Sequence, residues 1–467
     1  MNAELKENIA ALKDSPYLKG LYRPMTTEFD QALKAIDTDV PSDFEGLFMC
    51  NSSNPVFKPR GYYSWFDGDG MVHGTRFQNG RAHYTNRQVI TEELQKEKKA
   101  GRALYQGLFG KVDLNKPYGG LKDSSNTAIV EVDDKLLSMW HLSGTPYSIN
   151  PATLATEGPF SFASRLNKPM AAHTKTDPLT GDLVMFSYNM YEKPYLSYMV
   201  ANGERFHDVE IETPGPSFYH DIAITKSHSI LIHLPFYWNF DNEKQKRRSL
   251  FFDREQPTRF GVIPRWGTSE EVQWFEAEPC YMYHVVNSWE DRENIVLTGC
   301  RIEDPTYDNP RAGSSPREGA IVFAPVFYRW IFNLKTGKVT EGPLDDMLSE
   351  FPCINQQYSG QKSRFSYHGR FGNYETILMD ALIAYDTEND SRQVFQMPGG
   401  YFCNEPAFAP RMKSSSENDG YVLTYVTHEK QQGQLWIFDA SDIAAGPVSR
   451  LQLPGRIPIL FHGGWYK

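Results

Sequence analysis

Short runs of Val, Ile, Tyr and Phe alternate with turn residues along most of the chain. Such runs, bounded by turn residues, are typical of β-strands. The start differs, because Leu5, Ile9 and Leu12 fall on one face of a helix. This spacing predicts a short amphipathic helix over residues 3–13, packed on the main body.

One type of turn recurs between the strand-like runs. An Asp or Asn opens it by bonding its own backbone, and a Gly can supply the positive φ. Similar hairpins scattered along a whole chain predict a radial array of antiparallel sheets, a β-propeller. Strict internal repeats and the WD or kelch signatures are absent, so this pattern does not fix the number of blades. The turns are Asn150–Leu154, Asp177–Gly181, Asn333–Gly337, Asp386–Asp390 and Asp439–Asp442.

The composition supports a folded all-β protein. Of 467 residues, 40% are hydrophobic and 14% aromatic, with 35 Gly and 30 Pro. No stretch has the composition of a linker, and the most polar segments (95–102, 243–249 and 414–419) are expected on the surface. We therefore predict a single β-propeller domain over residues 1–467.

Charge and cysteine usage limit the environment and the partners. The net charge of −10 argues against nucleic acid as a partner. No apolar run reaches about 18 residues, and no secretory signal opens the chain. Five cysteines without a CxxC pair favour reduced thiols in a cytoplasm.

Four of the twelve histidines share a local context. Each follows an apolar or aromatic lead and precedes a small or turn residue: His173, His220, His284 and His462. The innermost strand of each propeller blade faces the axis, so single histidines from separate blades could converge on one metal ion. Imidazole suits iron, copper, zinc or nickel about equally. The ordinary alternative is a core or turn histidine, and this is our interpretation of His73, His83, His207, His228, His233, His368 and His428.

Taken in order, several further motifs resemble those of one family, the carotenoid cleavage oxygenases, which include stilbene and phenylpropenoid cleavers. The resemblance spans nearly the whole chain. Its motifs are Ser64–Met71 (SWFDGDGM), Tyr84–Arg87, Ala172–Pro178, His220-Asp221 with Thr225, His284 with Asn287 and Glu290, Asn404–Phe408, Asp439-Ala440 and Ile457–Trp465.

This resemblance implies a seven-bladed propeller capped by a dome of loops. It implies a non-haem Fe(2+) ion held by the four histidines named above. It also implies glutamates that bond the ligand imidazoles, and Glu350 and Glu405 match two of them. A carboxylate on the outer nitrogen fixes the tautomer and aims the ring. Thr127 matches a threonine whose methyl group lies near the sixth coordination position.

The chain departs from the family in two places. A third glutamate is missing, and His141 or Leu142 occupies its position, depending on a one-residue gap. One ligand, His220 by our interpretation, then lacks an anionic partner unless His141 supplies a different bond. The segment Cys50–Pro55 also differs from the family turn, and we expect this difference to be structural.

The activity implied is cleavage of a carbon–carbon double bond by O2 to give two carbonyl products. Phe66, Trp140 and Phe351 match positions that line the substrate tunnel. The segment Arg102–Gly110 resembles the carotenoid branch. The stilbene branch binds phenols through a tyrosine and a lysine, where this chain has Leu108 and His141. A carotenoid or apocarotenoid, a lipophilic polyene, is therefore the favoured substrate.

Three alternatives stay open: a dioxygenase of stilbenes or phenylpropenoids, a propeller scaffold with a degenerate iron site, and an isomerase that needs no O2. No protein partner is implied. The apolar run Ile230–Phe240, followed by the basic segment Lys244–Arg248, predicts peripheral membrane contact for an otherwise cytoplasmic protein. The alternative for this run is a buried strand followed by a solvated loop.

Overall fold

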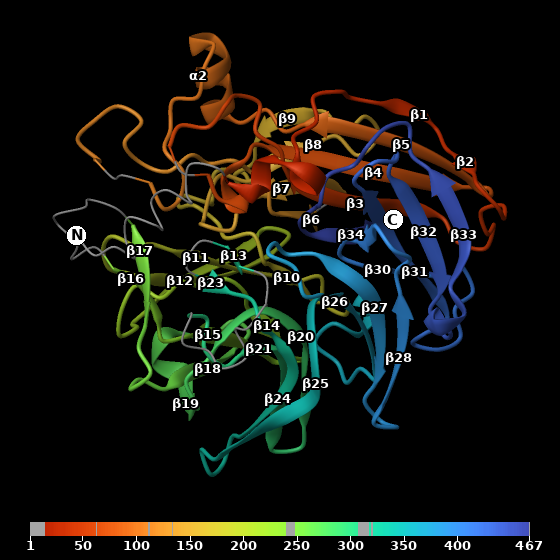
Figure 1. Cartoon of the computed structure of the whole chain (residues 1–467). Helices are drawn as coiled ribbons and strands as arrows, with labels where there is room; N and C mark the ends of the chain where they lie inside the picture. The colour runs from red at the N-terminus through yellow and green to blue at the C-terminus, as the bar shows by residue number, and fades with distance from the viewer. Residues whose placement is uncertain are drawn as a thin grey trace.

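Antiparallel strands arranged around one centre make up most of the protein (Figure 1). The computed structural model describes residues 15–466, except 62, 111–112, 133, 240–247, 307–316 and 319–320. The helix predicted over residues 3–13 lies outside the described residues. Four sheets of four or five strands each form one blade, and a 13-stranded sheet forms three more. The predicted all-β, seven-bladed propeller is confirmed.

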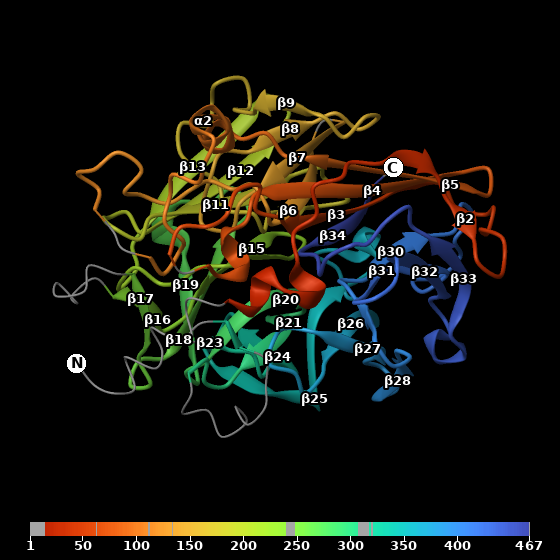
Figure 2. The same ribbon diagram turned by 45° about the horizontal axis from the view of Figure 1, so that its top comes forward.

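The first blade joins the two ends of the described chain. Its innermost strand β34 comes from the C-terminus and pairs with β3, with Leu47 opposite Tyr466 (Figure 2). This pairing closes the ring, so no blade edge is left open at the chain ends. From the axis outward the strands are β34 (Gly463–Tyr466), β3 (Gly46–Ser53), β4 (Gly70–Gln78), β5 (Arg81–Gln88) and β1 (Asp30–Ala32).

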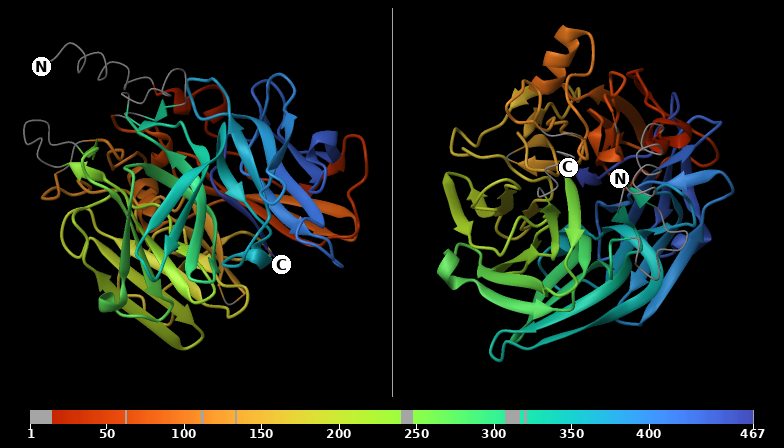
Figure 3. Two further views of the ribbon diagram at one scale, coloured as in Figure 1. Left: turned by 90° about the horizontal axis from the view of Figure 1, so that it is seen from below. Right: turned by 60° about the vertical axis from the view of Figure 1, so that its left-hand side comes forward.

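The next three blades each use four strands that are consecutive or nearly so, and they fan around the same centre (Figure 3). The second holds β6 (Ala128–Val132), β7 (Lys135–Met139), β8 (Tyr147–Ile149) and β9 (Thr156–Pro159). The third holds β10 (Lys175–Thr176), β11 (Leu183–Tyr188), β12 (Leu196–Asn202) and β13 (Arg205–Ile211). The fourth holds β14 (Ala223–Ile224), β15 (His228–His233), β18 (Thr258–Pro264) and β19 (Gln273–Ala277), with the hairpin β16 (Phe236–Asn239) and β17 (Ser249–Phe252) inserted.

The last three blades are linked by shared pairing. Strand β25 pairs with β24 near its start and with β26 near its end, so it passes from the outside of one blade to the inside of the next. The fifth blade holds β20 (Tyr281–Asp291), β21 (Asn294–Ile302), β24 (Val326–Asn333) and β25 (Val339–Cys353). The sixth adds β26 (Phe365–Phe371), β27 (Met379–Asp386) and β28 (Ser391–Gln396). The seventh holds β29 (Tyr401–Cys403), β30 (Ala407–Pro410), β31 (Gly420–His428), β32 (Gln434–Asp439), β33 (Pro447–Gln452) and β2 (Lys34–Ala35).

Short elements lie between these strands. No helix among the described residues is long and apolar enough to cross a membrane. The short elements are η1 (Pro16–Leu18), η2 (Gly20–Tyr22), η3 (Trp65–Asp67), α2 (Glu92–Ala100), η4 (Ser269–Glu271), η5 (Gln356–Tyr358), η6 (Ile443–Ala445) and the paired β22 (Arg317–Glu318) and β23 (Ile321–Val322).

All five predicted turns connect neighbouring strands of a blade. The Asp177 carboxylate accepts the Leu179 N–H at 2.8 Å, and the Asn333 side chain accepts the Thr336 N–H at 2.9 Å. Gly181 and Gly337 close these two turns with φ of 76° and 71°. The Asp or Asn that opens each turn, with Gly in two of them, therefore located these five blade hairpins correctly.

The polar segment 95–102 is largely the helix α2, which composition alone did not reveal. Thr91 accepts the Leu94 N–H at 3.1 Å, and Gly101 ends the helix with φ of 67°. Acidic residues occupy its first turn and lysines its last, as the helix dipole favours. These capping signals were present in the sequence.

The apolar run Ile230–Phe240 is a buried strand and hairpin rather than an exposed wedge. Ile230, Leu231, Phe236 and Trp238 are each at most 4% exposed. The described part of this run therefore offers no surface for a lipid. Arg248, the last residue of the basic segment, is also buried, and Lys244–Arg247 lie outside the described residues.

Candidate metal centre

In each of the seven blades, one site residue predicted from sequence lies within the innermost strand or a few positions before it. His173 lies two residues ahead of β10, His220 three ahead of β14, and His462 directly ahead of β34. His284 lies inside β20, where register shifts at Met282 and Val285 locally bend the strand. Because equivalent positions of radial blades meet at the axis, His173 and His462, 289 positions apart in sequence, become neighbours. The seven are Thr127, His173, His220, His284, Glu350, Glu405 and His462.

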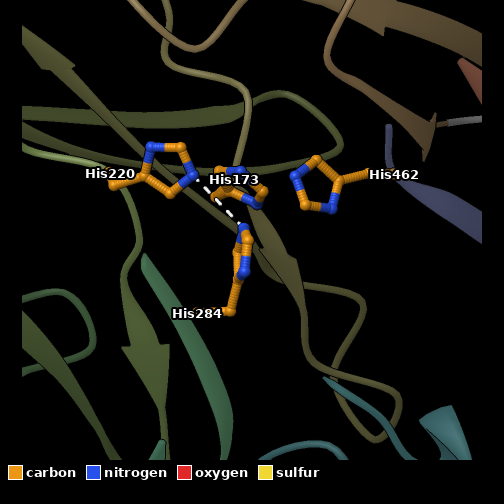
Figure 4. A group of neighbouring side chains, drawn as sticks. All are labelled: His173, His220, His284 and His462. Atoms are coloured by element: carbon orange, nitrogen blue, oxygen red, sulfur yellow. Dashed lines mark hydrogen bonds between the residues drawn. The ribbon is translucent and has the colours of Figure 1, made fainter. Parts of the chain in front are cut away.

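The four imidazoles meet at one point (Figure 4). One nitrogen from each ring lies within 4.8 Å of the corresponding nitrogens of the others. The Nε2 atoms of His220 and His284 are 3.2 Å apart, and the ring centroids of His173 and His462 are 4.5 Å apart. All four side chains are buried. The structure thus brings together the four histidines that sequence singled out, and their role as metal ligands remains a prediction.

Burial determines the protonation state of three of these four histidines. It lowers the pKa of His173, His220 and His284 well below the usual 6.5, and repulsion from neighbouring imidazoles lowers it further. These rings are therefore neutral at physiological pH, with lone pairs available. A metal ligand must be deprotonated in this way.

Two carboxylates hold two of the rings from outside. Glu350 Oε2 lies 2.5 Å from His284 Nδ1, and Glu405 Oε1 lies 3.1 Å from His462 Nδ1. Each carboxylate accepts a hydrogen bond from Nδ1–H, so the Nε2 lone pair of each ring faces the centre. Glu350 also accepts the N–H of Phe351, and Glu405 accepts the N–H of Gly463.

The donor set fits a divalent transition metal. His173 Nε2 is buried at the cluster without a hydrogen-bond partner among the described residues. An unsatisfied buried nitrogen is costly, and a metal ion would satisfy it. Four imidazole nitrogens, with carboxylates behind two of the rings, are a donor set that iron, copper, zinc or nickel accepts.

His220 is the ring without an anionic partner. Its Nδ1 is buried and has no hydrogen-bond partner in the described part of the chain. The ring of His141 lies 6.1 Å from that of His220, between centroids, and no hydrogen bond joins them. His141 Nδ1 instead lies 3.5 Å from Thr127 Oγ1, and burial lowers the pKa of His141 to about 3. The missing third glutamate is therefore not replaced by a bond from His141.

Thr127 is held firmly beside the cluster. Its hydroxyl donates to Asn126 Oδ1 at 2.9 Å and accepts the backbone N–H of His141 at 3.1 Å. Its carbonyl accepts the backbone N–H of His462 at 3.2 Å. These bonds fix the hydroxyl, so that the methyl group is the part of the side chain left without a polar partner.

The divergent segment Cys50–Pro55, which begins as the end of strand β3 rather than as a turn, braces the same region. Asn51 donates its backbone N–H to the His462 carbonyl at 2.9 Å, and its carbonyl accepts the Phe461 N–H at 2.9 Å. The segment has a structural role, as expected, and it supports the predicted ligand His462 directly. Sequence reasoning missed Asn51 and Phe461, although both adjoin motif residues.

An apolar cavity adjoins the cluster. Phe66 and Phe351 lie in its wall, as predicted, whereas Trp140 lines a neighbouring pocket beside Tyr63 and Lys122. The Phe351 ring packs 5.3 Å from His284 and 5.2 Å from His462, between centroids. The other aromatic and aliphatic wall residues were not foreseen from sequence: Trp65, Tyr283, Phe323, Phe371, Ile377 and Phe461.

Comparison with known proteins places this geometry in a family. The chain matches the family described as RPE65, retinal pigment epithelial membrane protein, over residues 22–467. It is 31% identical to carotenoid 9,10(9',10')-cleavage dioxygenase 1 of Phaseolus vulgaris, across 96% of this chain and 88% of that protein. It is 28% identical to isoeugenol monooxygenase of Pseudomonas nitroreducens, across 97% of this chain and 98% of that protein.

A solved structure shares the fold. The lignostilbene dioxygenase of Pseudomonas brassicacearum superposes with a TM-score of 0.87 at 24% identity, covering 97% of this chain and 98% of that one. At this identity the likeness concerns the architecture only. It agrees with the seven-bladed arrangement of the strands described above.

Proposed function

The chain belongs to the RPE65 family, which confirms the resemblance seen in its motifs, and from this premise we propose that it is a non-haem Fe(II) dioxygenase that cleaves a carbon–carbon double bond. The relatives named above are oxygenases, and this chain is an oxygenase enzyme. The observation that carries the proposal is the meeting of four buried imidazoles beside an apolar cavity.

The residues that would hold iron are His173, His220, His284 and His462, with Glu350 and Glu405 behind two of them. A ferrous ion bound there would supply open coordination positions and the electrons that activate O2 toward an alkene. A site without a carboxylate ligand keeps the full positive charge of the ion. Glu350 and Glu405 orient their rings, and we propose that the Thr127 methyl group limits what else can approach.

The cavity wall excludes water and positions the alkene. Two of its aromatic side chains, Phe66 and Phe461, have nearly parallel ring planes, 6° apart. The reaction adds both atoms of O2 across the broken C=C bond and yields two carbonyl groups, so no proton donor is needed. Positioning and exclusion of water are then the contributions of the protein.

The substrate we propose is a carotenoid or apocarotenoid. The named relative from Phaseolus vulgaris is a carotenoid cleavage enzyme, and the cavity wall of this chain is largely aromatic and aliphatic. The free space within this cavity is about 20 Å³, room for one small molecule. Wall side chains must therefore change rotamer to admit a polyene.

A phenylpropenoid is the second candidate. One relative is named isoeugenol monooxygenase, and His141 presents a buried Nε2 without a partner among the described residues at the wall of the cavity. A hydroxyl group on a substrate could bond this nitrogen. Leu108, in contrast, offers no polar group.

Metal analysis and isotope labelling test the proposal. Purified protein loaded anaerobically with Fe(II) should retain about one iron per chain, and ¹⁸O₂ should label both carbonyl products. His284→Ala should lose both iron and turnover, whereas His368→Ala, a buried histidine outside the cluster, should keep iron. Iron below about 0.1 per chain would support a scaffold, and turnover without ¹⁸O would support an isomerase.

Assays with both substrate classes decide between the two candidates. Parallel turnover of an apocarotenal and of isoeugenol should show cleavage of the apocarotenal. Cleavage of isoeugenol alone would reverse the assignment.

We also propose a cytoplasmic location with peripheral membrane contact, because a polyene dissolves in lipid rather than in water. Flotation with anionic liposomes tests the contact. Protein that stays at the bottom of the gradient would contradict it.

A further inference from the structure

A second cavity reaches the four histidines from another direction. Its volume is about 620 Å³, and His173, His284 and His462 lie in its wall. Its other walls come from the innermost strands, including Ala128–Glu131 of β6 and Gly463–Tyr466 of β34. Innermost strands face the propeller axis, so this cavity is an axial channel. The channel opens at Glu131, Asp134 and Gln356, which are exposed.

The apolar cavity and the axial channel share only two wall residues among the described ones, His284 and His462. Residues that precede an innermost strand, such as Thr127 and Phe461, face the apolar cavity. Residues within the strand that follows line the channel. The histidine cluster therefore separates an almost wholly apolar space from a more polar one.

The charges in the channel favour cations. Four carboxylates line its described part, against the single ammonium group of Lys175: Glu131, Asp134, Asp221 and Glu405. Lys175 Nζ lies 2.7 Å from Asp221 Oδ1, close to the histidines. Asp221 is further held by the N–H groups of Ile222 and Val285, at 2.7 and 2.8 Å.

We propose that the axial channel is the route by which a hydrated divalent cation reaches the four imidazoles. Glu131 and Asp134 attract the ion at the mouth, and the Lys175 ammonium group opposes its last step. The inference rests on the proposed metal site and adds the path by which that site is filled.

The physical reason is the cost of removing water from a small dication. A hydrated ion loses its oxygen ligands against aromatic walls, and an unsolvated charge in such surroundings costs many kcal/mol. In the channel, the exposed side chains of Asp134 and Gln356 offer oxygen in place of water. A groove lined by one sign of charge also raises the local concentration of the opposite ion.

The test measures the rate at which metal-free full-length protein takes up Co²⁺, by anaerobic stopped-flow absorbance, without any turnover. The double variant Glu131→Gln/Asp134→Asn should bind roughly three- to tenfold more slowly at low ionic strength. This difference should shrink at about 0.5 M salt, where charges are screened. Lys175→Gln should bind faster than the natural chain.

Glu210→Gln is the matched control, because Glu210 is an exposed carboxylate on the outer strand β13 and away from the channel wall. Its rate should equal that of the natural chain. Equal rates for the double variant and this control would overturn the channel proposal while the metal site stands. Failure of the natural chain to bind Co²⁺ at equilibrium would instead remove the proposed site, and the channel proposal with it.

Discussion

His284 and Glu350, 66 residues apart in sequence, form a buried pair in which Nδ1 and Oε2 are 2.5 Å apart. Strand β20 supplies the histidine, and the end of β25, where that strand crosses into the next blade, supplies the glutamate. The two inner strands meet at the axis and fix the direction in which His284 presents its other nitrogen. His462 and Glu405 repeat the arrangement, whereas His220 has no such partner among the described residues.

Replacing Glu350 with Gln should weaken metal binding about 10- to 100-fold, because an outer carboxylate both orients the ring and raises its basicity. Titration of metal-free protein with Fe(II) or Co²⁺ measures this. Glu276→Gln, at an exposed position of the outer strand β19, is the control and should bind normally. Unchanged affinity in Glu350→Gln would show that the pair does not support the metal.

Restoring a carboxylate opposite His220 should strengthen metal binding. His141→Glu places a carboxyl group in the cavity wall at a position whose ring now lies 6.1 Å from that of His220, between centroids, and His141→Gln is its uncharged match. We expect tighter Co²⁺ binding in the Glu variant than in the Gln variant. The metal-free Glu variant should lose about 1–3 kcal/mol of unfolding free energy, because the buried carboxyl lacks a partner. Equal affinities in the two variants would contradict this expectation.

Phe351 adopts a left-handed backbone conformation, with φ of 53°. An L-residue pays about 1–2 kcal/mol for this conformation, which glycine adopts freely. Phe351→Gly should therefore be about 1 kcal/mol more stable than Phe351→Ala, the reverse of the usual order in a strand. Urea unfolding of both variants measures the difference, and a more stable Ala variant would refute the strain.

Acid should destabilise the fold through its buried neutral histidines. Burial lowers the pKa of His73, His141, His233 and His368 to about 3, against 6.5 when exposed. The unfolded chain then binds more protons between pH 6.5 and 3, so stability is full above pH 6.5 and falls as pH decreases. Each histidine contributes up to about 1.4 kcal/mol per pH unit in that window.

His368→Gln tests one of these histidines, which lies away from the metal centre. Among the described hydrogen bonds, His368 Nε2 contacts only Ser366 Oγ, at 2.9 Å. Urea unfolding at several pH values should show that the unfolding free energy of the variant depends less steeply on pH than that of the natural chain, by about one proton. Asp67 has the opposite effect on the pH dependence of stability, since burial raises its pKa to about 6. An unchanged slope in the variant would show that His368 is already protonated in the fold.

Local sequence patterns were sufficient to identify the hairpins and the four histidines. An Asp or Asn that opens a turn bonds its own backbone, as Asp177 and Asn333 do, so the signal is contained in five residues. The histidines share short local contexts, and His173, His220 and His462 each lie shortly before an innermost strand. Helix α2 was not predicted because its segment was interpreted from its polar composition alone, without the capping residues Thr91 and Gly101.

Which atoms meet could be decided only by the tertiary structure. The closure of β34 on β3 brings His462 to His173, and the crossing of β25 between blades brings Glu350 to His284. Burial of Ile230–Trp238 depends on neighbouring sheets, which the run itself does not record. The sequence by itself determined the propeller and its candidate ligands, since these depend on local backbone preferences. The unpartnered nitrogen of His220 and the channel that reaches the other three histidines arise from the packing of distant strands, which no local pattern encodes.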